Sequence, residues 1–332
     1  MTEHQTAGQS ELAPGHGVAF IFPGQGSQSV GMLGEAALGS PVIGQTFAEA
    51  SDALSLDLWA LAKDGPAEDQ ALTANTQPLI LTASIALYRL WCERGGAVPS
   101  VAAGHSLGEF SALVAAGSLS FDDAVRLVRL RGQAMQESVP VGEGAMAAVL
   151  GLEDSIINRV CDEISGDAQS RVMAVNFNSP GQVVIAGHAP AVEEAMARLK
   201  SEGAKRILPL PVSAPFHTPL MGHAAQVLEE ALSSVELNDP RIPVISNVDA
   251  RPQTDAESIT RLLVKQVVAP VRWTDCVATM VDMGCDQFVE CGPGRVLSGL
   301  LRRIDKQLAG HAIEKPGDLE AAMQSISEDP SS

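Results

Sequence analysis

One pentapeptide of the chain carries a residue that can act as a nucleophile. Residues 104–108 read Gly-His-Ser-Leu-Gly and fit the pattern Gly-x-Ser-x-Gly. The glycines of this pattern permit a sharp turn that exposes the serine, here Ser106, and the helix that follows favours developing negative charge. An apolar stretch precedes the pentapeptide, as such a turn requires. The pattern predicts nucleophilic catalysis, with an incidental serine in a tight turn as the alternative.

A serine nucleophile needs a base, which is usually a histidine. Of the seven histidines, His217 lies between two prolines in Ser-Ala-Pro-Phe-His-Thr-Pro, so a non-helical stretch holds it rigidly. His105 adjoins the nucleophile, and we expect its side chain to point away from that of Ser106. His217 is therefore the candidate base, with a packed loop histidine as the alternative.

The group that would orient this histidine does not follow the pattern of α/β-hydrolases. Those enzymes use an acid that follows a strand, and their histidine lies near the end of the chain. Here the acids between Ser106 and His217 lie mostly in helical patterns or turns, and a long segment follows His217. We expect a backbone carbonyl or an amide side chain in the acid's place.

Alternating apolar strands and helices must position these residues, and they predict a parallel α/β sheet. The strands are expected at 17–22, 101–103, 244–246 and 287–290, and the helices at 77–94, 109–117 and 122–136.

The middle of the chain has a different order of elements. Strands at 145–150, 171–176, 182–186 and 205–210 and helices at 155–164 and 191–202 give β-α-β-β-α-β, the ferredoxin-like signature. We therefore expect an α/β fold in which a small ferredoxin-like α+β domain is inserted into a large domain. The large domain would comprise 17–140 and 213–310, the insert 141–212, a disordered leader 1–16, and a C-terminal helix with a frayed tail 311–332.

Composition excludes several classes of function. The 332 residues include 22 basic and 40 acidic ones, a net charge of −18, which disfavours nucleic acid and anionic membranes as partners. Hydrophobic residues make up 45%, which excludes a disordered chain, yet no stretch approaches the roughly 20 apolar residues of a membrane span. Five cysteines without Cys-x-x-Cys indicate neither a disulfide framework nor a zinc site, and favour the cytoplasm.

Seven motifs in one order carry a resemblance to a known family. They are Phe-Pro-Gly-Gln-Gly-Ser-Gln (22–28), Gly-His-Ser-Leu-Gly-Glu (104–109), Arg-Leu-Arg-Gly (129–132), Asn-Phe-Asn-Ser-Pro-Gly-Gln-Val-Val-Ile-Ala-Gly (176–187), Ala-Pro-Phe-His (214–217), Gln-x-x-x-Pro-Val-x-Trp (266–273) and Glu-x-Gly-Pro-Gly (290–294). With them the chain resembles the malonyl-CoA:acyl carrier protein transacylases of bacterial fatty acid synthesis. The resemblance implies an α/β-hydrolase-like large domain and ping-pong transfer of malonyl from malonyl-CoA to the pantetheine thiol of the carrier protein.

The same resemblance implies the roles of the reacting groups. Ser106 would carry the malonyl ester, and His217 would act as general base and then as general acid. A backbone carbonyl near Gln266 would orient His217, which fits the missing acid. The N–H groups of Gln25 and Leu107 would form the oxyanion hole, and the N–H after an elbow serine does point at the substrate oxygen.

The resemblance also selects a cation for the malonyl carboxylate. A guanidinium can give a buried carboxylate two parallel hydrogen bonds. Position alone leaves Arg126, Arg129 and Arg131 open, and the family's Arg-Gly placement selects Arg131.

Further residues are expected to contact the substrate. Asn178 and Gln182 would line the site in the cleft beside the small domain, and we also assign His105 to substrate binding. Phe216 and Leu107 favour malonyl over branched donors, although one methyl group is worth only about 1–3 kcal/mol. No metal or redox cofactor is expected, and a monomer is the expected state.

Other readings of the chain stay open. The nearest is a free-standing acyltransferase or editing acyl hydrolase of a polyketide pathway, although the latter tends to lack the carboxylate-binding arginine. An α/β-hydrolase esterase and a non-catalytic carrier-protein binding module are more distant.

The net charge raises a question about the carrier protein, because these carrier proteins are acidic as a family. The basic residues should therefore be spread unevenly, and we expect a basic rim beside the cleft. The candidates are Lys200, Lys205, Arg206, Arg302 and Arg303.

Overall fold

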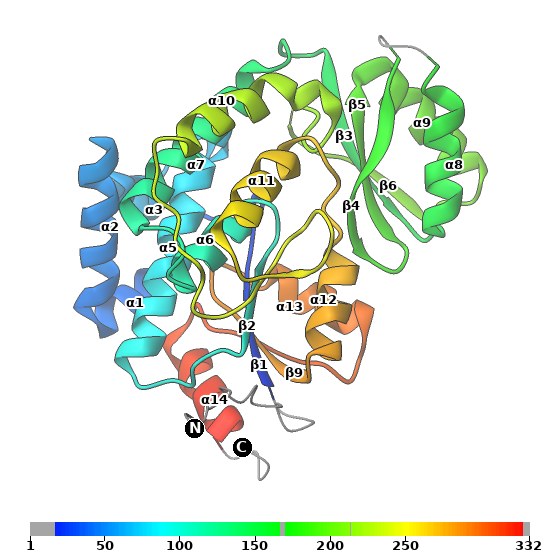
Figure 1. Ribbon diagram of the computed structural model, residues 1–332. Helices are drawn as coiled ribbons and strands as arrows, with labels where there is room; N and C mark the ends of the chain where they lie inside the picture. Colours follow the sequence, from blue (N-terminus) through cyan, green and yellow to red (C-terminus); the bar gives the residue numbers. More distant parts are fainter. Residues whose placement is uncertain (1–16, 167–169, 213, 328–332) are drawn as a thin grey trace, which may run out of the picture.

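The computed structural model describes residues 17–166, 170–212 and 214–327. The expected leader 1–16 and the last residues of the expected tail, 328–332, lie outside this range. Two sheets organise the chain, and Figure 1 shows the smaller one, β3 to β6 with α8 and α9, set to one side of the larger unit.

The larger sheet has six strands in the order β10-β9-β1-β2-β7-β8, and all are parallel except β8. Their bounds are β1 (Gly17–Phe22), β2 (Val101–Gly104), β7 (Val244–Ile245), β8 (Pro252–Gln253), β9 (Cys285–Glu290) and β10 (Ala309–Ala312). Along β1, Phe20 and Phe22 enter one hydrophobic core while Ala19 and Ile21 enter another. Both faces of the sheet are thus buried, which is why its strands read as continuous apolar runs.

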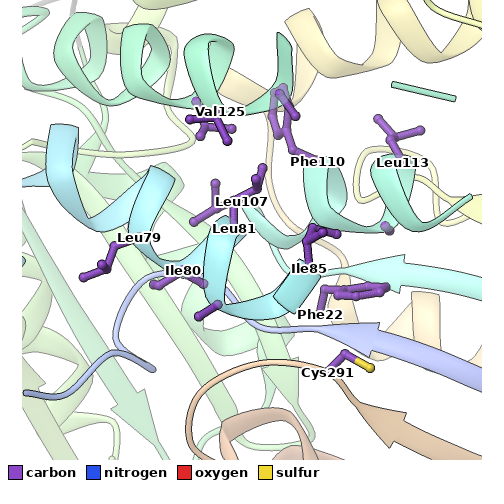
Figure 2. Close-up of a cluster of buried hydrophobic side chains, with 14 of the residues drawn as sticks. Phe22, Leu79, Ile80, Leu81, Ile85, Leu107, Phe110, Leu113, Val125 and Cys291 are labelled. Atoms are coloured by element: carbon purple, nitrogen blue, oxygen red, sulfur yellow. The ribbon is translucent and has the colours of Figure 1, made fainter. Parts of the chain in front are cut away.

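Helices cover both faces of this sheet. Their bounds are α1 (Gly34–Gly39), α2 (Pro41–Leu54), α3 (Leu58–Asp64), α4 (Ala67–Ala71), α5 (Thr73–Glu93), α6 (Gly108–Ala115), α7 (Phe121–Glu137), η1 (Pro219–Met221), α10 (Gly222–Leu232), α11 (Ala256–Val267), α12 (Trp273–Asp282), α13 (Val296–Ile304) and α14 (Pro316–Ser327). The core between β1, α5 and α6 contains Phe22, Leu81, Leu107 and Phe110, which gather in Figure 2. The side chain of Leu107, next to the candidate nucleophile, is thus anchored in this core.

Helix α5 begins at Thr73, four residues before the expected start at residue 77. The expected start came from the apolar residues at helical spacing, which begin with Leu81. Pro78 lies inside the helix and has no N–H for the Ala74 carbonyl one turn earlier. Arg129 of α7 donates to that carbonyl at 2.9 Å, so the neighbouring helix supplies the missing hydrogen bond.

The smaller sheet is antiparallel, in the order β4-β5-β3-β6. Its elements are β3 (Gly144–Leu150), α8 (Asp154–Ile164), β4 (Val172–Ser179), β5 (Gln182–His188), α9 (Ala189–Ser201) and β6 (Arg206–Pro209), in the expected ferredoxin-like sequence. On β3, Ala147 and Val149 pack against α8 and α9, while Met146 and Ala148 face a cavity on the opposite side. This alternation makes the small sheet a wall of that cavity.

One strand crosses a boundary that we expected from the sequence. Strand β10 pairs with β9 in the large sheet and runs through residue 310, where the large domain was expected to end. Its sequence, Ala-Gly-His-Ala, lacks the β-branched and aromatic residues that signal a strand. Among the described residues, no helix is both long and apolar enough to cross a membrane.

Candidate active site

Ser106 lies in a sharp turn between the end of β2 and the start of α6. Its φ is 52°, a left-handed conformation that non-glycine residues rarely adopt. The turn is pressed against the loop after β1: a Cβ on Gly108 would lie 2.0 Å from the Phe22 carbonyl oxygen, and one on Gly24 would lie 2.5 Å from the His105 carbonyl oxygen. Glycine at both positions is therefore required for this close approach.

His217 lies beside the serine with the geometry of a general base. The Ser106 hydroxyl and the His217 Nε2 are 2.8 Å apart, and the His217 Nδ1 is 2.9 Å from the main-chain carbonyl oxygen of Gln266. A carbonyl can only accept, so Nδ1 carries the hydrogen and Nε2 is free to accept the serine proton. A carbonyl thus occupies the place of the acid in an ordinary triad.

The electrostatics keep this base neutral. His217 is buried, and this burial is the main reason that its pKa is lowered to about 3. The nearby Arg131 cation lowers the pKa of His217 further. At neutral pH the imidazole is therefore unprotonated and ready to accept a proton.

Arg131 is the arginine of α7 that reaches the cavity. It is 1% exposed; its Nη1 donates to the Gln77 Oε1 at 2.8 Å, and its Nη2 donates to the Gln266 Oε1 at 2.9 Å and lies 3.3 Å from the Ser106 hydroxyl. Burial lowers the pKa of Arg131 to about 10, so it stays a cation at neutral pH. The structure thus places a fixed positive charge beside the nucleophile.

The other two arginines that the sequence left open lie elsewhere. Arg126 pairs with Asp122 on the exposed side of α7, and Arg129 bonds to Ala74 and Asn75 of α5.

A cavity of about 290 Å³ opens over these groups, between the large sheet's loops and the small sheet. All the predicted site residues line it except Gln266, which is buried behind them. Apolar side chains form much of its wall: Met135, Met146, Val184, Leu210, Val212, Phe216, Val296, Leu297 and Leu300. A buried cation at the base of an apolar pocket suits a ligand with an anionic end and an uncharged body.

Two main-chain donors border the nucleophile as expected. Gln25 and Leu107 both line the cavity, and neither N–H makes a hydrogen bond within the part of the chain that the structure describes. Free main-chain N–H groups beside the nucleophile, here one at the start of α6 and one in the turn after β1, can stabilise an oxyanion.

Three polar residues of the site have positions that the sequence did not settle. His105 lines the cavity, and its ring lies against Asn178 and Trp273, with 2.8 Å between its Nε2 and the Asn178 Oδ1. Gln182 lines the cavity and accepts a hydrogen bond from the exposed Arg303. Arg303, one of the residues expected to form a basic rim, therefore lies at the edge of the cavity.

Sequence reasoning missed four polar residues of this region. Gln77 and Asn176 line the cavity, while Glu109 and Asn247 lie buried behind the serine turn. Glu109 and Asn176 belong to motifs 104–109 and 176–187, and Asn247 follows a parallel strand, a position where polar residues often serve a site. These signals were present but did not reveal which contacts each residue makes.

None of the five cysteines, all of which the structure describes, lines this cavity. All five cysteines are free thiols, and Cys291 is buried in the core of Figure 2, where burial raises the pKa of its thiol. Within the described ranges, no cluster of three or more histidine, cysteine or acidic side chains could hold a metal ion.

Comparison with known proteins agrees with this geometry. A family model described as an acyl transferase domain matches residues 19–315. The malonyl CoA-acyl carrier protein transacylase of Escherichia coli (strain K12) is 52% identical over 307 residues, which cover 92% of this chain and 98% of that protein. The transacylase of the same name from Bacillus subtilis (strain 168) is 45% identical, and the match covers 94% of this chain and 98% of the relative.

Solved structures give the same result. A type II PKS acyl carrier protein in complex with its malonyl-transacylase includes a chain with a TM-score of 0.91 and 50% identity, covering 93% of this chain and 99% of that one. An acyl carrier protein S-malonyltransferase from Vibrio cholerae has a TM-score of 0.89 and 52% identity, covering 92% and 99%. The match over nearly the whole length, together with the serine, histidine and arginine of the cavity, shows that the chain belongs to the acyl transferase domain family.

Proposed function

We propose that the chain is a malonyl-CoA:acyl carrier protein transacylase that works through a malonyl ester of Ser106. The observation that carries this proposal is the Arg131 guanidinium, a buried cation 3.3 Å from the hydroxyl that His217 activates. An acyl group that ends in a carboxylate can pair with this cation while its thioester carbon reaches the serine. The proposal agrees with the names of the relatives that the chain resembles.

The first half-reaction uses the groups already described. His217 Nε2 takes the Ser106 hydroxyl proton as the serine oxygen attacks the thioester carbon, and the N–H groups of Gln25 and Leu107 hold the developing oxyanion. The carbon–sulfur bond then breaks, and the CoA sulfur leaves with the proton from His217. The malonyl group remains on Ser106.

The second half-reaction reverses these steps with a different thiol. His217 takes the proton of the carrier protein's pantetheine thiol, whose sulfur attacks the serine ester. The carbon–oxygen bond breaks and His217 returns the proton to Ser106. These steps use only side chains and main-chain groups of this chain and its two substrates.

The experiment follows the acyl group by intact mass. We expect malonyl-CoA to add one malonyl group to the protein, and holo acyl carrier protein to remove it and become malonylated. Ser106→Ala should stay unlabelled. Labelling of this variant would overturn the assignment of the nucleophile, and rapid loss of the label to water without carrier protein would favour an editing hydrolase.

The carrier protein of fatty acid synthesis is the proposed acceptor, and a polyketide carrier is the second candidate. The latter is favoured by one specific observation, since a matching solved structure holds a type II PKS acyl carrier protein with its malonyl-transacylase. Comparing kcat/KM for the two carrier types separates them. The monomeric state and the cytoplasmic location stay predictions.

A further inference from the structure

Glu109 is a buried acid that touches the site without lining the cavity. It lies in the first turn of α6 and is 3% exposed. A single carboxylate oxygen, Oε2, accepts two hydrogen bonds: one from the main-chain N–H of Asn247 at 3.0 Å and one from the Gln266 Nε2 at 2.8 Å. A carboxylate with two such partners fixes both of them, because it offers only acceptors.

The first consequence concerns the side chain of Gln266. Its Nε2 faces two acceptors, the Glu109 Oε2 and the Ser106 carbonyl oxygen at 3.0 Å, so its Oε1 must face the other way. There Oε1 accepts the hydrogen bond from Arg131. A reversed amide would set its oxygen against two acceptors, the Glu109 Oε2 and the Ser106 carbonyl oxygen, and its nitrogen against the Arg131 donor. Glu109 therefore favours the orientation in which Arg131 finds an acceptor.

The second consequence concerns the strained serine turn. The main-chain N–H of Asn247 is held by Glu109, while its side-chain Oδ1 accepts the Ser106 N–H and its Nδ2 donates to the Gly104 carbonyl, each at 2.7 Å. Through Asn247 the acid thus supports the turn in which Ser106 has a positive φ.

The charges around Glu109 agree with this role. Burial raises the pKa of Glu109 to about 7, and its two hydrogen bonds and the Arg131 cation act against that rise. The negative charge of Asp249 also raises the pKa of Glu109. Near neutral pH Glu109 is therefore present in both its protonated and its ionised form. In either form Oε2 can accept the two hydrogen bonds, and the ionised form partly compensates the Arg131 charge on the other side of the Gln266 amide.

We propose that Glu109 is a positioning residue that orients the Gln266 amide and, through it, holds the Arg131 guanidinium toward the malonyl carboxylate. The proposal rests on the proposed function. It assigns the preference for a carboxylated donor to a relay of three side chains, Glu109 to Gln266 to Arg131, rather than to the arginine alone.

The test compares two donors in acylation of Ser106 before turnover. Glu109→Asp keeps the charge but shortens the side chain, so it cannot hold both partners. We expect its acylation rate with malonyl-CoA to fall by about 10- to 100-fold, the size expected when hydrogen bonds in a charged network are lost. The rate with acetyl-CoA, whose acyl group has no carboxylate, should change far less.

Two variants separate positioning from a general structural effect. In Glu109→Gln the amide oxygen can accept both hydrogen bonds, so this variant should restore the malonyl-to-acetyl ratio. Glu290 is a matched control, since it is a fully buried acid that accepts from the N–H groups of Leu297 and Ser298 at 2.9 and 2.7 Å. Glu290→Ala should lower thermal stability without changing the ratio.

The outcomes decide the proposal directly. An equal fall with both donors in Glu109→Asp, or a Glu109→Gln variant as impaired as Glu109→Asp, would overturn it. Failure of the wild-type chain to accept malonyl on Ser106 would instead overturn the proposed function. The two results are distinguishable because wild type is measured with both donors in the same experiment.

Discussion

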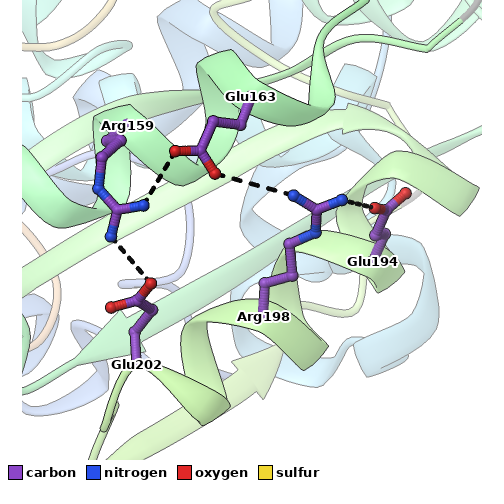
Figure 3. Close-up of polar contacts among 5 residues, drawn as sticks. All are labelled: Arg159, Glu163, Glu194, Arg198 and Glu202. Carbon is purple, nitrogen blue, oxygen red and sulfur yellow. Dashed lines mark hydrogen bonds and ion pairs between the residues drawn. The ribbon is translucent and has the colours of Figure 1, made fainter.

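Two extended polar networks in this molecule both contain arginine and glutamate side chains, but in opposite surroundings. On the small sheet's helices, ion pairs join Arg159, Glu163, Arg198, Glu194 and Glu202, with nitrogen–oxygen distances of 2.5 to 3.8 Å (Figure 3). These side chains are 39–49% exposed, so water and salt screen their charges. Such pairs typically contribute about 0–1 kcal/mol each.

The network behind the nucleophile is buried. Glu109, Arg131, His217 and Gln266 are at most 3% exposed, and each has a partner among the others or in the serine turn. In such surroundings the loss of one partner leaves a group that water cannot reach, which is far more costly than the loss of an exposed pair. The comparison teaches that the groups beside the nucleophile owe their strength to burial, whereas the exposed ion pairs of the small sheet are weakened by water and salt.

The largest expected effect comes from removing the buried cation. Arg131→Ala should lower kcat/KM for malonyl-CoA by about 100-fold or more, because the malonyl carboxylate would be buried without a partner. Transfer of acetyl should be spared or improved. Steady-state kinetics with both donors check this, with Arg126→Ala as the control from the exposed side of the same helix. Equal losses for the two donors would show that Arg131 is not the carboxylate clamp.

The next effect concerns acid stability. The pKa of His217 is about 3 in the folded chain, below the value of about 6.5 for an unperturbed histidine. The stability that the fold gains from keeping His217 neutral is therefore complete above about pH 6.5. This stability is lost as the pH falls toward 3, by about 1.4 kcal/mol per pH unit.

The variant His217→Asn has no histidine to protonate at this position, so it does not lose this stability in acid. Its free energy of unfolding relative to wild type should therefore rise by about 1 kcal/mol between pH 7 and pH 5.5. Urea unfolding of both proteins at the two pH values measures the gain. Glu109 contributes in the opposite direction, since its raised pKa favours the fold at low pH, but it is common to both proteins. A gap that is independent of pH would contradict a neutral, buried His217.

A smaller effect is expected from an exposed charge at the cavity's edge. Arg303→Glu should raise the KM for acyl carrier protein several-fold and leave the KM for malonyl-CoA unchanged, since a rim charge acts on encounter with an acidic partner. Arg198→Glu makes the same charge change on the small sheet's helices and serves as the control. If both variants raised the KM for acyl carrier protein equally, Arg303 would act only through the net charge of the protein.

The smallest effect should come from the exposed network itself. Arg159→Ala breaks the links to Glu163 and Glu202 and should lower the free energy of unfolding only slightly, because water already screens these exposed charges. The cost should shrink further in 1 M salt, and kcat/KM should not change. A salt-independent loss of several kcal/mol would remove the contrast between the two networks.

Much of the architecture could be predicted because its signals are local. Apolar runs mark the buried parallel strands, and the order of elements marks the ferredoxin-like insert. Strand β10 escaped because its residues have low strand propensity and its pairing with β9 is what makes it a strand. The start of α5 was not predicted because the hydrogen bond that Pro78 cannot make is supplied by Arg129, a side chain of the distant helix α7.

The site residues that could be predicted are those whose type the reaction itself requires. A serine turn, a rigid histidine and an arginine could be proposed from residues and resemblance, and the structure brings them together. Glu109 and Asn247 could not, because their roles depend on the convergence of α6, α11 and the loop after β7. Tertiary contacts between distant segments leave no periodicity in the sequence.

The alternation of side chains in strand β3 has a consequence for how this protein can change over generations. Met146 and Ala148 shape the wall of the cavity, while Ala147 and Val149 pack in a separate core with α8 and α9. Substitutions at the first pair alter the space open to an acyl group and leave the helix-side packing intact. The small sheet thus separates positions where selection acts on donor size from positions that hold its helices. A substitution at Met146 or Ala148 disturbs only the small cluster with Val175, Val184 and Ala186, while the core with α8 and α9 is unchanged.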